Sequence, residues 1–114
     1  MPHLLEPLLK MDELNMSFKK HEILQQFSEV AINFLPTYKY IKKSNKYDSK
    51  RTPSWCDRIL YKSTNPLKLM VEKYGRKENM HYSDHKPVFG IFNIFVRRES
   101  KTNKQKLYEE FMKW

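Results

Sequence analysis

The chain has 114 residues, which is enough for at most one small domain. Hydrophobic residues make up 39% and charged residues 31%, so we expect a modest core under a strongly solvated surface. The sequence contains no apolar run near the roughly 18 residues of a membrane span and no pattern of a signal peptide. A single cysteine excludes an internal disulfide and fits a reducing compartment. We therefore expect a cytoplasmic protein, or one held peripherally at the cytosolic face of membranes.

The net charge of +9 is unevenly distributed. Residues 36–62 contain six lysines and two arginines against two aspartates, a net charge of +6. Such a concentration of positive charge attracts the phosphates of a nucleic acid, an anionic lipid or a small polyphosphate. A solvated lysine-rich surface without a ligand explains the composition equally well.

The spacing of apolar residues predicts helices at both ends of the chain and short strands between them. The predicted elements are a helix over residues 4–27 with one break, a strand-like stretch at 32–34, a basic loop at 37–54, strands at 57–61, 67–71 and 88–96 around a loop at 72–87, and a helix at 103–114. Leu107, Tyr108, Phe111 and Trp114 give the last helix its apolar side. Because three separated strands do not cover both faces of a sheet, the chain either has partners or belongs to something larger.

Cys56 does not fit a cysteine phosphatase. That chemistry needs a thiolate in a loop that ends on an arginine six positions later, and here this position is Lys62. The intervening residues contain no glycine, and the neighbouring Asp57 disfavours a thiolate. We interpret Cys56 as a small, part-buried side chain.

Asp84 and His85 stand directly before the predicted strand 88–96, on a rim where functional sites are often built. With His81 they would form a three-ligand metal site on a helix, but Pro87 disfavours a helix there. The pair of Asp84 and His85 is more suggestive of a catalytic site than the three residues are of a metal site, and an incidental cluster is the alternative.

Asp57 and Arg58 are adjacent in a predicted strand, so their side chains point to opposite faces. Each must then find a partner elsewhere. A carboxylate beside a histidine fixes the histidine's tautomer, and a guanidinium offers a planar fork to phosphate oxygens. Ordinary surface ion pairs are the alternative. Lys39, between Tyr38 and Tyr40, is a second candidate for phosphate binding, unless this aromatic loop only packs on the body.

Three motifs together resemble the inositol polyphosphate 5-phosphatase family. They are Phe34-Leu35-Pro36-Thr37-Tyr38-Lys39-Tyr40, Pro53-Ser54-Trp55-Cys56-Asp57-Arg58-Ile59-Leu60-Tyr61 and Ser83-Asp84-His85-Lys86-Pro87-Val88. Their order and spacing are similar to those of the family, and the resemblance covers about residues 4–96. It implies an α+β fold, namely the C-terminal portion of a partial DNase I-like two-sheet β-sandwich with outer helices. Residues 1–96 would be the C-terminal part of the catalytic domain, and residues 97–114 a basic linker with an amphipathic helix.

The resemblance also implies a reaction and a set of roles. Family members hydrolyse the 5-phosphate of phosphoinositides or soluble inositol polyphosphates with the help of Mg²⁺. Asp57 would orient His85, His85 would contact the scissile phosphate, and Asp84 would lie near the metal ion and the attacking water. Lys39 and Tyr38 would bind substrate phosphates, with Lys39 at the 4-phosphate, and Arg58 would contact phosphate or support the site. Nucleic acid is not an expected partner, because these motifs are typical of enzymes that act on inositol phosphates.

The sequence departs from the family pattern at Gln26 and Val30, near which the family tends to have glycines, and above all in residues that it lacks. The metal-binding glutamate and the Gly-Asp-x-Asn motif, which lie upstream in the family, have no counterpart here. We therefore expect a fragment that is inactive alone and whose partner is the missing N-terminal part of the domain. The alternative is a catalytically dead module that binds inositol phosphates or anionic membranes through residues 36–62.

Overall fold

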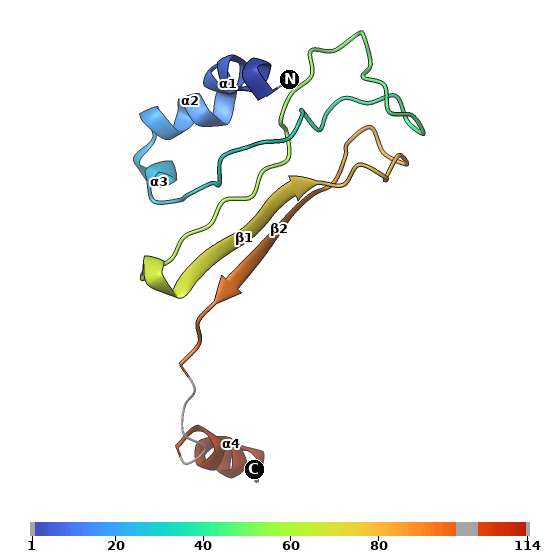
Figure 1. Ribbon diagram of the computed structural model, residues 1–114. Coiled ribbons are helices and arrows are strands. Elements are labelled where there is room, and N and C mark those ends of the chain that lie inside the picture. The colour runs from blue at the N-terminus through green and yellow to red at the C-terminus, as the bar shows by residue number, and fades with distance from the viewer. Residues whose placement is uncertain (1, 98–102, 114) are drawn as a thin grey trace.

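The computed structural model describes residues 2–97 and 103–113 (Figure 1). In chain order the elements are α1 (Pro2–Lys10), α2 (Glu13–Lys20), α3 (Glu22–Gln25), a 3-10 helix (Pro66–Lys68), β1 (Leu69–Arg76), β2 (Val88–Ile94) and α4 (Lys104–Met112). Helices and an antiparallel two-stranded sheet confirm the predicted α+β class. Within the described ranges, no helix is long and apolar enough to cross a membrane.

The N-terminal helical region has two breaks, where the sequence predicts one. Asp12 begins α2 as its N-cap, and its carboxylate accepts a hydrogen bond of 3.0 Å from the backbone N–H of Asn15. A side chain that satisfies this otherwise unpaired N–H favours a new helix start over continuation of α1. His21, with extended backbone, separates α2 from α3.

β1 and β2 form a hairpin that pairs from Leu69 opposite Ile94 to Arg76 opposite Val88. The register shifts between Val71 and Lys73, as in a β-bulge. β1 therefore begins two residues after the start of the predicted strand 67–71 and continues through five residues that were predicted to be a loop. Pairing with β2 explains this difference, because hydrogen bonds to a neighbouring strand override a weak local preference.

The strands predicted at 32–34 and 57–61 are wrong. These segments run extended beside the hairpin (Figure 1). Among the described residues, the isolated bridge that involves either segment joins Tyr61 to Ser28, which lies before the first segment. Their apolar pattern reflects burial of side chains such as Ile32 and Phe34, not pairing of their backbone.

The core is small and lies between α1, the two extended segments and the hairpin. Its buried members are Ile32, Phe34, Trp55 and Tyr74, with Leu5, Leu9, Val30, Ile59 and Val88 packed against them. Trp55 Nε1 donates a hydrogen bond of 2.9 Å to the carbonyl oxygen of Phe34. The Phe34 ring meets Tyr74 edge-on at 5.2 Å. This core fixes the segment that carries Asp57 relative to the strand that follows His85.

At the C-terminal end, α4 forms where an amphipathic helix is predicted. Its apolar side chains Leu107, Tyr108 and Phe111 are exposed. Arg98 of the predicted basic linker and Trp114 lie outside the described residues. The division into a domain at 1–96 and a tail at 97–114 stays a prediction.

Candidate active site

The structure brings Asp57 and His85 together across 28 residues of sequence. His85 Nδ1 lies 2.6 Å from Asp57 Oδ2, and the two side chains are 39% and 47% exposed. If Nδ1 carries the proton that Asp57 accepts, Nε2 is left free to face a ligand. The contact that the family resemblance implies is thus present, and the catalytic roles of both residues stay predictions.

Tyr38 lies beside this pair, and Lys39 follows it in the chain. The Tyr38 ring is tilted over the His85 ring, with 4.6 Å between centroids. Lys39 Nζ lies 3.6 Å from Asp48 Oδ2, and the backbone N–H of Asp48 donates to the Lys39 carbonyl oxygen at 2.8 Å. A hydrogen bond from the Lys50 backbone, together with the charge of Lys39, holds the pKa of Asp48 below its usual value. Lys39 is therefore a positioned cation that already has a counter-ion.

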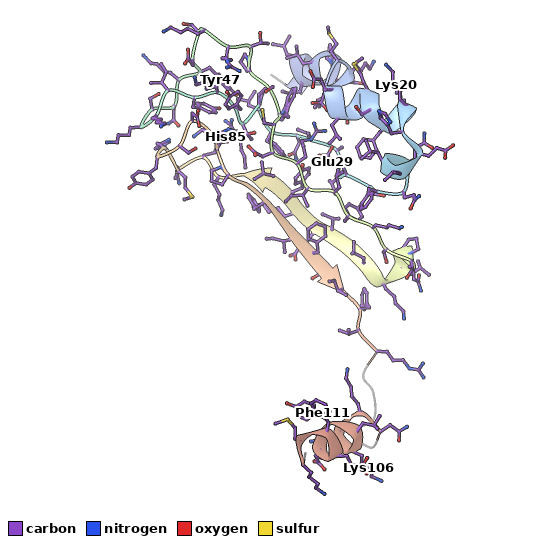
Figure 2. The ribbon with its side chains drawn as sticks, turned by 180° about the vertical axis from the view of Figure 1, so that it is seen from behind. Lys20, Glu29, Tyr47, His85, Lys106 and Phe111 are labelled. Carbon is purple, nitrogen blue, oxygen red and sulfur yellow. The ribbon has the colours of Figure 1, made fainter. Side chains whose placement is uncertain are left out.

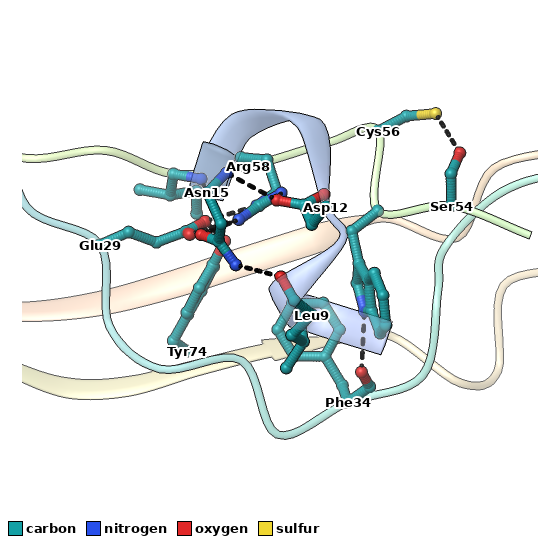
Figure 3. Close-up of polar contacts among 11 residues, drawn as sticks. Leu9, Asp12, Asn15, Glu29, Phe34, Ser54, Cys56, Arg58 and Tyr74 are labelled. Carbon is teal, nitrogen blue, oxygen red and sulfur yellow. Dashed lines mark hydrogen bonds and ion pairs between the residues drawn. The ribbon is translucent and has the colours of Figure 1, made fainter. Parts of the chain in front are cut away.

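Arg58 is committed to the fold. Its guanidinium donates to Asp12 Oδ2 and to Glu29 Oε1, each at 2.6 Å, and all three side chains are at most 8% exposed (Figure 3). Further bonds run from Nε to Glu29 and from Nη2 to Asn15. Burial opposes the charge, but the hydrogen bonds to Glu29 and Asp12 raise the pKa of Arg58. A phosphate contact by Arg58 would have to compete with two carboxylates, so this geometry favours a structural role.

Asp84 offers a single carboxylate. Its Oδ1 lies 3.4 Å from Ser83 Oγ, and its backbone oxygen accepts a hydrogen bond of 2.8 Å from Tyr40. In the part of the chain that the structure covers, no group of three or more His, Cys, Asp or Glu side chains could hold a metal ion. These residues therefore do not form a complete magnesium site, and the metal contact predicted for Asp84 stays a prediction.

Cys56 is exposed, so its predicted partial burial is wrong. Adjacent side chains in extended backbone point to opposite sides, and Trp55 occupies the inward position. Cys56 Sγ lies 3.0 Å from Ser54 Oγ at the surface (Figure 3).

Sequence reasoning missed two basic residues near His85. Lys86 is buried at 2% exposure, and its neighbour in space Arg76 stacks its guanidinium 5.6 Å from the Tyr40 ring centroid. Only the place of Lys86 inside the motif of residues 83–88 points to it in the sequence. Arg76 lies in a stretch that was predicted to be a loop and has no comparable signal.

Comparisons with known proteins show which family the chain resembles. The model of the endonuclease/exonuclease/phosphatase family 2 matches residues 3–91. Phosphatidylinositol 3,4,5-trisphosphate 5-phosphatase 2 of Mus musculus is 41% identical over 93% of this chain and 10% of its own length. The chain belongs to the inositol polyphosphate 5-phosphatase family. The type IV phosphatidylinositol polyphosphate 5-phosphatase of Mus musculus, another 5-phosphatase, is 42% identical over 79% of this chain and 14% of its own length.

The chain thus spans about a tenth of the length of the curated 5-phosphatases it matches. A solved inositol polyphosphate 5-phosphatase domain, that of SPsynaptojanin with inositol (1,4)-bisphosphate and calcium, aligns with a TM-score of 0.51 and 27% identity. It covers 99% of this chain, which in turn covers 36% of that domain. This match confirms the predicted partial DNase I-like fold.

A second solved neighbour carries a different ligand. The ferrous NO complex of Cimex nitrophorin aligns with a TM-score of 0.61 and 26% identity, over 83% of this chain and 37% of that one. Since one fold serves an inositol phosphatase and a nitric oxide complex, a function for this chain has to be argued from its own side chains.

Proposed function

We propose that this chain supplies part of the site that binds the substrate phosphates in an inositol polyphosphate 5-phosphatase domain, which removes the 5-phosphate. The observation that carries the proposal is the 2.6 Å contact between His85 and Asp57, with the Tyr38 ring against His85. A protonated His85 donates from Nε2 to a phosphate oxygen, and Asp57 orients the ring and stabilises its positive charge. Both side chains are exposed enough for a ligand to reach them.

Lys39 supplies the second contact with substrate in this proposal. Its ammonium lies 3.6 Å from Asp48, and its side chain remains 32% exposed, so a substrate phosphate can approach it from solvent. A phosphate next to the scissile one would then replace Asp48 as the counter-ion of Lys39. A point charge of this kind favours a phosphate without fixing its orientation.

A divalent cation belongs to the proposal for a complete domain. Phosphatases of this family generally use divalent metals, and the solved SPsynaptojanin domain contains calcium. A bound cation would offset charge on the phosphate oxygens. Because residues 2–97 and 103–113 gather no three-ligand group, we expect the 114-residue chain by itself to release little phosphate and only to bind the ligand weakly.

The test is calorimetric titration of the whole chain with inositol 1,4-bisphosphate, beside a phosphate-release assay with inositol 1,4,5-trisphosphate. Loss of a hydrogen bond to a charged group costs ~1.5–3 kcal/mol, so His85→Gln should weaken binding by about tenfold or more. His21→Gln, in an exposed position between two helices, is the matched control and should bind as the unmodified chain does. Absence of binding, or an equal loss in both variants, would contradict the proposal.

A second function has its own observation. Lysines 42, 43, 46 and 50 and Arg51 are all exposed in the loop beside the site, which suits an anionic membrane surface and a place at the cytosolic face of a membrane. In co-sedimentation with phosphatidylserine vesicles, the triple change Lys42→Ala, Lys43→Ala and Lys46→Ala should abolish binding, whereas His85→Gln should not. Equal sedimentation of the triple variant and the unmodified chain would exclude this function.

A further inference from the structure

Two loops meet beside His85, the loop of residues 36–48 and the loop of residues 81–86. Figure 2 shows Tyr47 of the first and His85 of the second close together at one end of the molecule. Three backbone hydrogen bonds join the loops, and we call them the clamp: Lys86 N–H to Thr37 O at 2.9 Å, Tyr40 N–H to Asp84 O at 2.8 Å, and Lys43 N–H to His81 O at 2.5 Å.

The clamp brackets two candidate phosphate-binding residues. Tyr38 and Lys39 lie between Thr37 and Tyr40, and both of these residues are bonded to the loop that carries His85. The position of the Tyr38 ring, 4.6 Å from the His85 ring, therefore depends on how firmly the two loops are joined.

The side chain of Lys86 lies in the middle of this junction. It is 2% exposed, and its Nζ donates to Asn45 Oδ1 at 2.9 Å and to the Glu78 carbonyl oxygen at 2.8 Å. The same nitrogen lies 3.5 Å from His81 Nδ1 and 4.9 Å from the centroid of the Tyr40 ring. Asn45 and Tyr40 belong to the first loop, while His81 belongs to the second. One ammonium group thus contacts both sides of the clamp.

A buried ammonium is stable only while its acceptors stay in place. Lys86 forms no ion pair within the described residues, so it depends on the neutral acceptors and on the Tyr40 ring. If the loops separated, these contacts would be lost together. Burial of this charge therefore favours the joined arrangement over a loosely packed one.

The first loop is also fastened to β1, independently of Lys86. Arg76 donates to the Pro36 carbonyl oxygen at 3.0 Å, and the Tyr47 hydroxyl donates to the same oxygen at 2.6 Å. The Tyr40 and Tyr47 rings stack at 4.3 Å. Because the two hydrogen bonds to the Pro36 oxygen do not involve Lys86, the loop should keep its place on the body when Lys86 is changed. The effect of such a change should then be local to the clamp.

We infer that Lys86 is a positioning residue whose buried ammonium holds Tyr38 against His85, and the neighbouring Lys39 in its place, before any phosphate binds. The inference rests on the proposed function for the role of the three positioned residues. Holding them in place in the free protein lowers the entropic cost of ordering them when a ligand binds. Because Lys86 is buried, a change of Lys86 should weaken binding through the position of these residues and not through a lost contact with the ligand.

The test compares Lys86→Met with Lys86→Arg in the whole chain without ligand. Hydrogen exchange at the amides of Tyr40, Lys43 and Lys86 should be about tenfold or more faster in Lys86→Met, while amides between β1 and β2 keep their rates. The ring-current shift that Tyr38 imposes on the His85 ring protons should shrink in the same variant. Lys86→Arg, which keeps the charge, should recover most of both signals, and Lys77→Met, at an exposed lysine, should change neither.

Asn45→Ala provides a variant that leaves the core untouched, because Asn45 is exposed and its side chain contacts Lys86 Nζ. It should accelerate exchange at the same three amides, to a smaller extent than Lys86→Met. Unchanged clamp amides in both variants, or equal acceleration throughout the hairpin, would overturn the inference.

Binding of inositol 1,4-bisphosphate separates the two proposals. If the clamp amides and the ring-current shift respond as expected but the unmodified chain binds no bisphosphate, Lys86 still positions the loops and the proposed function fails. If the unmodified chain binds and Lys86→Met binds equally well, the proposed function stands and the positioning role is overturned.

Discussion

The end of the molecule around His85 and the outer side of the hairpin are built in opposite ways. At the first, polar or charged side chains are buried, with Lys86 at 2% and Thr37 at 0% exposure. At the second, apolar side chains face solvent, with Met70 at 57% and Ile91 at 45% exposure. Buried polar groups next to uncovered apolar ones reverse the usual arrangement of a complete small domain.

The two regions differ in whether the chain itself supplies the contacts that their side chains need. The buried polar groups at the site find most of their partners within the chain, in the hydrogen bonds between residues 36–48 and 81–86. On the outer side of the hairpin, the side chains of Met70 and Ile91 stay about half exposed. Because the chain covers 36% of the solved 5-phosphatase domain, we expect the rest of a complete domain to pack there.

The largest expected effect is at Arg58, whose charge offsets the two buried carboxylates of Asp12 and Glu29. Arg58→Met leaves both without their cation, and breaking a buried pair of this kind costs ~3–5 kcal/mol in free energy of unfolding. Urea denaturation followed by circular dichroism measures this. Arg51→Met, at an exposed arginine, should change the same free energy by less than ~0.5 kcal/mol. Similar losses in both variants would mean that the buried network does not hold the fold.

Tyr74 should make the stability of the network depend on pH. Burial, together with the hydrogen bond to Glu29, raises the pKa of Tyr74 from 10.0 to about 12. Because the folded state keeps the neutral phenol, this stabilisation is complete below pH 10 and is lost as the pH rises from 10 to 12. Denaturation midpoints across this range should fall less steeply in Tyr74→Phe. An equally steep fall in the variant would contradict the assignment to Tyr74.

Asp57→Asn should separate function from stability at the site. Both side chains of its pair with His85 are well exposed, so the free energy of unfolding should change by only ~0–1 kcal/mol. Binding of inositol 1,4-bisphosphate should weaken by about tenfold, because an amide stabilises the protonated His85 less well. Calorimetry and denaturation on the same samples measure both. Full affinity in Asp57→Asn would remove Asp57 from the site.

The smallest expected effect on stability is on the open side of the hairpin. Ile91→Thr replaces an exposed apolar side chain and should change the free energy of unfolding by no more than ~0.5 kcal/mol. Self-association, measured by sedimentation, should nevertheless decrease, because exposed apolar surface and open strand edges promote it. Ile41→Thr, at an equally exposed isoleucine in the loop near the site, should leave self-association unchanged. Reduced self-association in Ile41→Thr but not in Ile91→Thr would assign the self-associating surface to the loop near the site.

Local sequence patterns predict part of this structure. Residues 88–96 are a near-continuous apolar run, and β2 forms there at 88–94. The motifs place Tyr38, Asp57 and His85 in one candidate site, and the alternation of a strand correctly implies that Asp57 and Arg58 find separate partners. These features depend on residues close in sequence or on a pattern shared with the family.

The rest depends on contacts between distant residues, which a single sequence does not specify. Arg58 pairs with Glu29 and Asp12, 29 and 46 positions away. Its guanidinium, which could bind a phosphate, therefore binds two carboxylates inside the fold. Ile32 and Phe34 alternate as a strand does, yet they fill the core without pairing their backbone. In the sequence Lys86 resembles any surface lysine, because its partner Asn45 is 41 positions away.

The most direct test of the account is a nuclear magnetic resonance titration of the ¹⁵N-labelled chain with inositol 1,4-bisphosphate. We predict saturable shifts at the amides of Tyr38, Lys39 and His85, small shifts along β1 and β2, and loss of the pattern in His85→Gln. Shifts confined to residues 42–51 that persist in His85→Gln would contradict it, because the ligand would then follow the basic loop and not the site built around His85.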